Sequence, residues 1–366
     1  MSFFETINEF KLFDFEKYFQ SITEIDVKKS LDKDGLNSFD LLNLLSNTAS
    51  PYIEQMAQRA NRLTRQYFGR VISLYAPLYI SDYCNNSCTY CGFSRQNNFK
   101  RKKLSIKEIE AEARVLSKIG IKHVLVLTGE DPVNASVSYL AEAVEVLSRY
   151  FSSLALEVFP MDIDDYRTII NAGADSITVY QEVYDENVYQ DVHPKGMKSN
   201  YKYRLLTPER GALAGFRAIN IGPLFGLGRV HSEAFFAGLH AKYLEKNYPD
   251  VEISVSVPRM TKAQGGIEPK NLLSDKKLVQ FILAWRLYMP RLGINISTRE
   301  PAWLRDKLIH LGATKFSAGS KTDVGGYSLN SETNTSQFEL SDMRSVDQVV
   351  QTIKDNGYQV VFKDWN

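Results

Sequence analysis

The stretch that decides the fold runs from Val71 to Cys91, VISLYAPLYISDYCNNSCTYC. It opens with an apolar, β-branched run over residues 71–80, a composition that is typical of a buried strand. It ends with Cys84, Cys88 and Cys91, which are the only three cysteines of the chain. The sequence therefore predicts a cysteine-bearing loop that directly follows a strand.

Seven further apolar runs follow at 123–128, 154–159, 176–181, 218–222, 252–257, 293–298 and 314–318, separated by segments of helical period. Strands that alternate with helices form parallel sheets, and eight such strands close a barrel. We therefore predict an α/β fold, a TIM-type (β/α)8 barrel, over residues 71–318. Residues 1–70 are predicted to form a helical N-terminal extension, and residues 319–366 a loop and a short C-terminal cap.

The composition excludes several classes of protein. The 366 residues include 44 Lys and Arg against 43 Asp and Glu, a net charge of +1, so neither nucleic acid nor an anionic membrane is an expected partner. No apolar run approaches the ~18 residues that cross a bilayer. Glu5, Glu9 and Asp14 near the N-terminus are unlike a secretory signal. We expect a cytoplasmic protein that binds a small molecule.

The three cysteines have C-x3-C-x2-C spacing. Three thiolates at this spacing can hold three corners of a cubane [4Fe-4S] cluster, and they leave the fourth iron open. The spacing leaves two alternatives, a zinc site completed by one of the five histidines and buried structural cysteines. An odd number of cysteines in so long a chain is not a disulfide framework.

The cysteine loop resembles that of the radical S-adenosylmethionine (SAM) superfamily. The resemblance implies that SAM chelates the open iron, and that one-electron reduction cleaves SAM to methionine and a 5′-deoxyadenosyl radical. Tyr90, just before the last cysteine, would belong to the cofactor site. Thr128-Gly129-Glu130 follows the second predicted strand, where the superfamily has Gly-Gly-Glu, and Gly129 and Glu130 would bind the SAM ammonium. Read alone, this segment is a turn.

Two more residues fit the same resemblance. Glu182 would bind the ribose of SAM, and Arg204 its methionine carboxylate, because a guanidinium suits a carboxylate ligand. The alternative is an ion pair between a strand end and a helix.

Arg299 directly follows an apolar strand, at the end of the barrel where the chemistry of such folds is located. A charge in that position needs an anionic partner, and an amino-acid carboxylate would serve. The alternative partner is the neighbouring Glu300. Glu300 and Ser317 are themselves predicted to line the substrate pocket.

Further blocks, from about residue 40 to 366, resemble one branch of the superfamily, the 2-iminoacetate synthases, which are the tyrosine lyases of thiamine thiazole biosynthesis. The blocks are Leu63-Thr64-Arg65-Gln66, Pro77-Leu78-Tyr79, Cys91-Gly92-Phe93-Ser94, Val179-Tyr180-Gln181-Glu182, His193-Pro194-Lys195-Gly196, Gly265-Gly266-Ile267-Glu268-Pro269, Ser297-Thr298-Arg299-Glu300, Gly325-Gly326-Tyr327 and Lys363-Asp364-Trp365.

The resemblance implies a reaction. The adenosyl radical would abstract hydrogen from the amino group of L-tyrosine, and the Cα–Cβ bond would then break to give 4-methylphenol (p-cresol) and 2-iminoacetate (dehydroglycine). The imine would pass to thiazole synthase, and an external donor such as flavodoxin or ferredoxin would reduce the cluster. Three cysteines leave no ligands for a second cysteine-bound cluster, which the hydrogenase-maturing tyrosine lyase and biotin synthase need. A related tryptophan lyase, and a non-catalytic iron–sulfur or zinc protein, stay open as alternatives.

Overall fold

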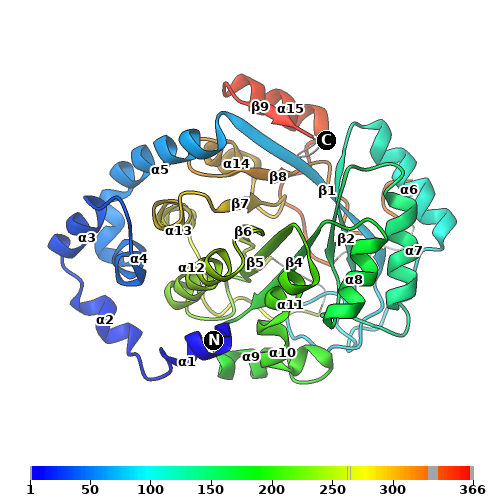
Figure 1. Ribbon diagram of the computed structural model, residues 1–366, viewed down its shortest axis with the longest axis horizontal. Coiled ribbons are helices and arrows are strands. Elements are labelled where there is room, and N and C mark those ends of the chain that lie inside the picture. The colour runs from blue at the N-terminus through cyan, green and yellow to red at the C-terminus, as the bar shows by residue number, and fades with distance from the viewer. Residues whose placement is uncertain (1, 262, 264, 329–336, 363–366) are drawn as a thin grey trace.

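The computed structural model describes residues 2–261, 263, 265–328 and 337–362. Its centre is a ring of eight parallel strands, hydrogen-bonded in chain order and closed by pairing of the first strand with both the second and the eighth (Figure 1). The strands are β1 Val71–Ser81, β2 His123–Thr128, β3 Ser153–Glu157, β4 Ser176–Glu182, β5 Ala218–Pro223, β6 Glu252–Ser256, β7 Gly293–Ile296 and β8 Lys315–Ser317. The predicted (β/α)8 fold is confirmed.

Helices follow the strands and surround the ring (Figure 1). They are α6 Ile106–Lys118, α7 Val137–Leu147, α8 Ile163–Asn171, α9 Glu186–Val192, η2 Met197–Ser199, α10 Tyr201–Leu205, α11 Thr207–Ala214, α12 Val230–Asn247, α13 Asp275–Tyr288 and α14 Ala302–Leu308. Side-chain caps define where several of them begin. At α6, for example, Ser105 and Glu108 form a capping box, which satisfies two backbone N–H groups at the start of the helix.

The chain before β1 forms a second helical layer on one side of the barrel. Its elements are α1 Phe3–Asn8, α2 Phe15–Ser21, α3 Glu24–Leu31, α4 Ser38–Leu45, η1 Asn47–Tyr52 and α5 Ile53–Phe68. Both α4 and α5 pack on α13. Because α13 is covered from outside as well as from the barrel, it is buried on almost every face, from Leu278 to Tyr288.

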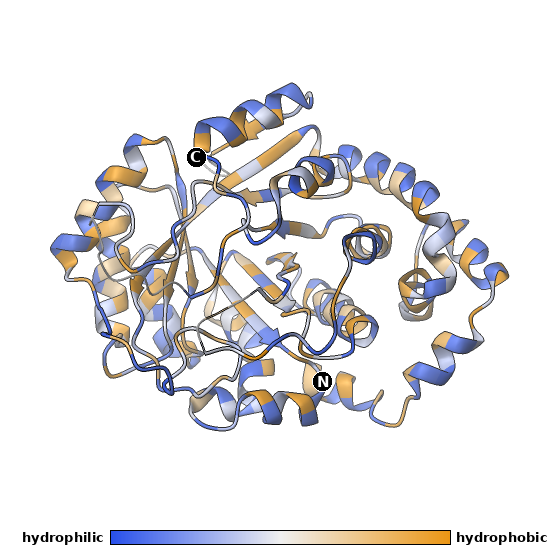
Figure 2. Cartoon of the chain, turned by 180° about the vertical axis from the view of Figure 1, so that it is seen from behind, coloured by the Kyte–Doolittle hydropathy of each residue, from blue (hydrophilic) through white to orange (hydrophobic). Residues whose placement is uncertain are grey.

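Apolar side chains concentrate where helices meet strands, while the outer faces of α5 and α15 are mainly polar (Figure 2). One continuous hydrophobic core includes residues from Phe3 to Tyr358, so the extension and the barrel do not have separate cores. The division at residues 70 and 318 therefore stays a prediction. Within the described residues, no helix is long and apolar enough to span a bilayer.

The chain after β8 divides into two parts. The helix α15, Val346–Asp355, begins beside Gly319 at the end of β8, where the eighth helix of a barrel belongs. The strand β9, Gln359–Val361, then pairs with residues Val71–Ser73 at the amino end of β1. The predicted helix and strand are present: the helix begins near the carboxyl end of β8, and the strand lies at the amino end of β1. The Lys363-Asp364-Trp365 block lies outside the described residues.

A buried ion pair attaches the segment at 337–342 to the barrel. Arg305 of α14 is fully buried, and its guanidinium pairs with Asp342 and donates to the carbonyl of Ser317. Asp342 also accepts from Arg344, with 2.7 Å between Nη2 and Oδ2. An uncompensated buried charge is costly, so this pair determines where the segment crosses the barrel.

Asp342→Ala should lower the free energy of unfolding by about 3–5 kcal/mol, because it leaves the Arg305 guanidinium buried without its carboxylate. Urea denaturation followed by circular dichroism measures the change. The control is Asp306→Ala. The Asp306 side chain is 34% exposed and pairs with Arg344, so its loss should lower the free energy of unfolding by less than about 1 kcal/mol. Equal losses in the two variants would contradict this account of the pair.

Candidate functional site

The mouth of the barrel holds a cavity of about 1370 Å³, including the space open to solvent. Its lining comes from the carboxyl ends of the strands and the loops that follow them, where parallel barrels carry their active sites. Ten of the eleven predicted site residues line this single cavity, and they are Cys84, Cys88, Tyr90, Cys91, Gly129, Glu130, Glu182, Arg204, Arg299 and Ser317. The fold thus brings together predicted site residues that are up to 233 positions apart in the sequence.

The cysteine loop is held by a neighbouring segment, the His193-Pro194-Lys195-Gly196 block. The Ser87 N–H donates to the carbonyl of Lys195 at 3.0 Å. Tyr90 Oη lies 2.7 Å from Nε2 of the buried His193. Gly196 has a φ of 101°, and a Cβ there would lie 2.2 Å from Oδ1 of Asn86. The block therefore supports the loop, and its glycine is required by both conformation and space.

The chemistry of the three thiols fits a metal cluster. Burial raises the pKa of Cys84 to about 11 and raises the pKa values of Cys88 and Cys91 as well. Thiolates in this environment need a metal to offset the cost of their charge. In the described ranges, no three Cys, His, Asp or Glu side chains are grouped to hold a single metal ion. The three thiols line one cavity, where they can serve as the three protein ligands of a [4Fe-4S] cluster.

A neutral cluster of four charges lies beside the cysteine loop. Arg204 Nη1 is 2.8 Å from Glu130 Oε1, and Lys198 Nζ is 2.6 Å from Glu182 Oε1. The cross pairs, Lys198 with Glu130 and Arg204 with Glu182, are both 3.8 Å apart. Burial would raise the pKa of Glu130, but Arg204 and Lys198 hold it below its ordinary value. We call these four residues the ion cluster.

Lys198 is a member of the ion cluster that the sequence analysis missed. Burial would lower its pKa, but the neighbouring carboxylates raise it instead, so the ammonium stays charged. Lysines in loops are mostly exposed, so nothing in the local sequence distinguishes this one. The available signal was its position, two residues after Gly196 in a block already selected for another reason.

Glu182 has a strained backbone. Its φ of 68° is the only positive value for a non-glycine residue in the described part of the chain. The register between β4 and β5 shifts between Tyr180 and Glu182, so the last residue of β4 departs from the regular ladder. Strain of this kind is retained where it aims a side chain at a functional site.

Gly129 permits a close approach between the end of β2 and the cysteine loop. A Cβ at this position would lie 2.3 Å from the carbonyl oxygen of Tyr83 and 3.0 Å from Cβ of Cys84. Its N–H already donates to the carbonyl of Ser81 at 2.9 Å. The first role of this glycine is therefore to make room for the cysteine loop.

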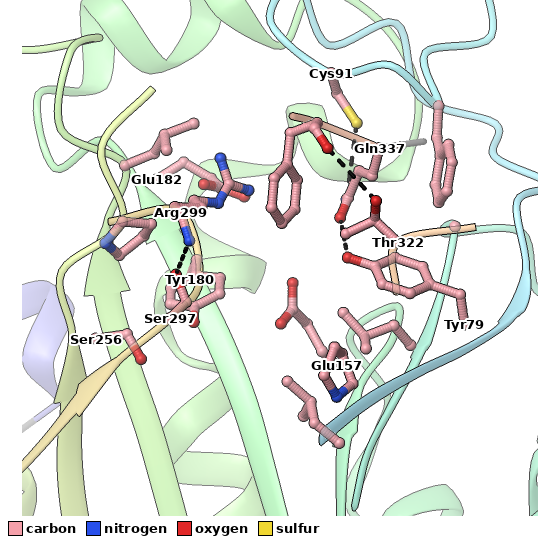
Figure 3. Close-up of a pocket in the computed structure, with 18 of the residues that line it drawn as sticks. Tyr79, Cys91, Glu157, Tyr180, Glu182, Ser256, Ser297, Arg299, Thr322 and Gln337 are labelled. Atoms are coloured by element: carbon pink, nitrogen blue, oxygen red, sulfur yellow. Dashed lines mark hydrogen bonds between the residues drawn. The ribbon is translucent and has the colours of Figure 1, made fainter. Parts of the chain in front are cut away.

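The side chain of Arg299 points into the cavity (Figure 3). Its guanidinium carbon is 3.3 Å from the centroid of the Phe338 ring. Among the described residues, no carboxylate lies within ion-pair distance of it. Ser317 lines the same cavity, and its Oγ accepts from the Thr298 N–H at 2.9 Å.

Glu300 does not line this cavity. It pairs instead with Arg259, with 3.0 Å between Nε and Oε1. Residues 298–300 form a turn in which the Glu300 N–H donates to the carbonyl of Ser297 at 3.3 Å. The alternative ion pair between Arg299 and Glu300 is not formed. Glu300 lines an adjoining cavity that Arg299 also lines, so its role in the substrate pocket stays a prediction.

The segment at 337–342 crosses the mouth beside the thiols. Gln337 Nε2 lies 3.9 Å from Sγ of Cys91, and Gln337 Oε1 accepts from the Tyr79 hydroxyl at 2.7 Å (Figure 3). Phe338 covers Arg299, as described above. Sequence analysis assigned this segment only to a loop, since no local pattern shows what a loop covers.

Gly129→Ala should lower the free energy of unfolding by about 1–3 kcal/mol, because the added methyl group overlaps the Tyr83 carbonyl. The displaced loop should also retain less iron and sulfide after anaerobic reconstitution, which chemical analysis measures. Gly35→Ala is the matched control, since a Cβ at Gly35 meets nothing within 4 Å. Iron retention in Gly129→Ala equal to that of the control would refute the steric argument.

Comparisons with known proteins agree with this geometry. A family model described as the Radical SAM superfamily matches residues 78–228, and one described as the Biotin and Thiamin Synthesis associated domain matches residues 256–359. Among solved structures, HydG, a maturase of the [FeFe]-hydrogenase, superposes with a TM-score of 0.89 at 29% identity. That match covers 98% of this chain and 80% of HydG.

Curated relatives identify the branch. The 3-methylornithine synthase of Methanosarcina acetivorans is 26% identical over 74% of this chain and 75% of its own length. The 2-iminoacetate synthases of Salmonella typhimurium and Escherichia coli are each 40% identical over 345 residues, which is 94% of this chain and 91% of theirs. On this identity and coverage, the chain belongs to the 2-iminoacetate synthase family of the radical SAM superfamily.

Proposed function

We propose that this chain is a radical SAM lyase that cleaves the Cα–Cβ bond of L-tyrosine to 2-iminoacetate and 4-methylphenol. The activity is the one named for relatives that share 40% identity over nearly the whole chain. The observation that carries the proposal is a single cavity lined by three thiols and by Arg299, which has no carboxylate partner among the described residues.

The residues of the cofactor side fit a [4Fe-4S] cluster and SAM. Cys84, Cys88 and Cys91 would hold the cluster, since they are the only thiols and all line the cavity. When bound and reduced, the cluster and SAM supply a 5′-deoxyadenosyl radical that can take a hydrogen atom from a substrate.

The ion cluster and its neighbours would bind SAM. Glu130 and the carbonyl of Gly129 suit its ammonium, Glu182 its ribose, and Arg204 its carboxylate. Arg204 donates from Nε to the carbonyl of Tyr180 at 2.7 Å and from Nη1 to Glu130, which leaves further N–H groups of its five for a ligand. Tyr90, held by His193, forms part of the same wall.

The substrate side would hold the amino acid by its carboxylate. Arg299 offers a planar pair of N–H donors there, and Ser317 contributes to the wall. Fixing the carboxylate restricts which hydrogen of the substrate lies within reach of the radical, so binding geometry sets the position of attack. The segment at 337–342 limits the access of water, which would hydrolyse the imine product.

Two protein partners complete the proposal. The imine is short-lived in water, which favours direct transfer to thiazole synthase, the enzyme that would consume it. The cluster needs one electron for each SAM molecule cleaved, which an external donor such as flavodoxin or ferredoxin would supply.

The protein reconstituted anaerobically with iron and sulfide should form 5′-deoxyadenosine and 4-methylphenol from SAM, dithionite and L-tyrosine, as chromatography of the mixture would detect. The Cys84/Cys88/Cys91→Ala triple variant should form neither product, because it has no thiolate left for iron. Formation of 3-methylindole derivatives from tryptophan, without 4-methylphenol from tyrosine, would move the protein to the tryptophan lyases. Absence of 5′-deoxyadenosine from the reconstituted wild type would overturn the radical mechanism.

Arg299→Ala should reduce 4-methylphenol formation by roughly 100-fold, the scale of a lost charged hydrogen bond, while SAM cleavage continues. Arg299→Lys should recover only part of the activity, because an ammonium lacks the planar fork. Product ratios from the same assay measure both effects. Arg62→Ala, on the exposed face of α5, is the control and should keep the parental ratio. Loss of SAM cleavage together with 4-methylphenol in Arg299→Ala would place Arg299 in the cofactor site instead.

A further inference from the structure

One carboxylate in the cavity has no role in the site as described so far. Glu157 is the last residue of β3, and its side chain points into the cavity (Figure 3). The other acidic side chains at the mouth have cationic partners, Glu130 and Glu182 in the ion cluster and Glu300 with Arg259. In the described part of the chain, no hydrogen bond or ion pair reaches the Glu157 carboxylate. A half-buried acid without a partner points to a ligand.

Glu157 shares the cavity with groups from both halves of the proposed site. Burial, followed by repulsion from Glu182, raises the pKa of Glu157 to about 7, while Arg299, Lys198 and Arg204 oppose that shift. Glu182, Lys198 and Arg204 belong to the ion cluster, where SAM would bind, and Arg299 would bind the substrate. Glu157 therefore lies within electrostatic reach of both the proposed cofactor groups and the proposed substrate arginine.

Three tyrosines complete its surroundings. Burial raises the pKa values of Tyr75 and Tyr79 from β1 and of Tyr180 from β4 above the ordinary value. The charge of Glu157 raises them further. These phenols stay neutral near pH 7, so the charge state of Glu157 depends mainly on the four charged groups named above and on the ligand.

We propose that Glu157 binds the α-ammonium group of the amino-acid substrate and accepts one proton from it. The inference rests on the proposed function. The ammonium and the carboxylate of an amino acid share one carbon, so the protein groups that bind them must face each other closely. Arg299 is the cation that acts most strongly on Glu157. The phenol hydroxyl lies at the far end of the substrate, away from Arg299.

The proton transfer is balanced and needs no further reagent. The ammonium N–H bond breaks, an O–H bond forms on Glu157, and the products are a neutral amine and a neutral carboxylic acid. No electron moves between the two groups. The step matters because loss of a hydrogen atom from an ammonium would leave a positively charged radical, whereas loss from an amine leaves a neutral one. An acceptor that titrates near neutral pH suits this task.

The test measures ligand binding to the reconstituted, unreduced holoenzyme with SAM, so that no turnover occurs. Equilibrium dialysis gives dissociation constants for L-tyrosine, L-phenylalanine and 3-(4-hydroxyphenyl)propanoate, which lacks the amino group. In Glu157→Gln, the constants for tyrosine and phenylalanine should rise by the same factor, about tenfold or more, while that for the propanoate stays unchanged. Glu142→Gln, an exposed position on α7, is the matched control.

Two other patterns would overturn the proposal. Weaker binding of tyrosine and the propanoate, with phenylalanine unaffected, would assign Glu157 to the phenol hydroxyl. Unchanged binding of all three ligands would show that Glu157 contacts no substrate. The melting temperature and the SAM affinity of each variant establish that it is folded. Failure of the wild type itself to bind or cleave tyrosine would refute the proposed function, and that result is distinguishable from failure of Glu157→Gln alone.

A second readout separates proton transfer from binding. With saturating tyrosine, the wild type should produce more 4-methylphenol per SAM cleaved as pH rises through about 7, where Glu157 loses its proton. Glu157→Asp should keep this dependence, and Glu157→Gln should lose it. A parental pH profile in Glu157→Gln would refute the role as proton acceptor.

Discussion

The architecture of the site depends on the buried ion cluster of Glu130, Glu182, Lys198 and Arg204. No side chain in it is more than 12% exposed, and two negative charges balance two positive ones. Loss of one partner from a buried pair typically costs about 3–5 kcal/mol, because the other charge is left without compensation. The four residues come from the ends of β2 and β4 and from η2 and α10, which follow β4, so the cluster joins two strand ends that only β3 separates in the sheet.

The position of the cysteine loop follows from that cluster. Asn86, between Cys84 and Cys88, donates from Nδ2 to Glu130 Oε2 at 2.9 Å and accepts at Oδ1 from the Lys198 N–H at 2.9 Å. One amide side chain thus ties the loop to a carboxylate and to the segment that carries a cation. The strained φ of Glu182 fits the same constraint, since the cluster holds its carboxylate in place. The cysteine loop and the residues proposed to bind SAM are therefore positioned as one unit.

The sequence predicted the parts of this structure that local pattern controls. All eight strands agree with the predicted runs to within two residues at either end, because buried parallel strands are continuous apolar segments. Cysteine spacing identified one wall of the cavity. Lys198 was missed because its burial depends on partners that are distant in sequence. Glu157 was missed because it lies inside the apolar run 154–159, which was interpreted only as a strand.

The position of Glu300 follows from the turn after β7, which a strand pattern does not predict. Ser297, Thr298 and Arg299 all line the cavity, and Glu300, the next residue of that turn, pairs with Arg259. Within β3, by contrast, the two-residue alternation of a strand places Ala155 and Glu157 inside the barrel, and it would have selected Glu157 from the sequence. Inward-facing polar residues at the ends of strands are therefore better candidates than polar residues near strand ends in general.

The contact between Phe338 and Arg299 shows how the chain beyond β8 contributes to chemistry at the mouth. An aromatic ring over the face of a guanidinium removes water from that face and leaves the N–H groups at its edge free. Those edge donors are the ones that a carboxylate needs. Phe338 keeps its place because Asp342, four residues later, is anchored by the buried Arg305. The Arg305–Asp342 ion pair thus helps to position Phe338 over Arg299, the residue proposed to bind the substrate, although neither Arg305 nor Asp342 lines the cavity.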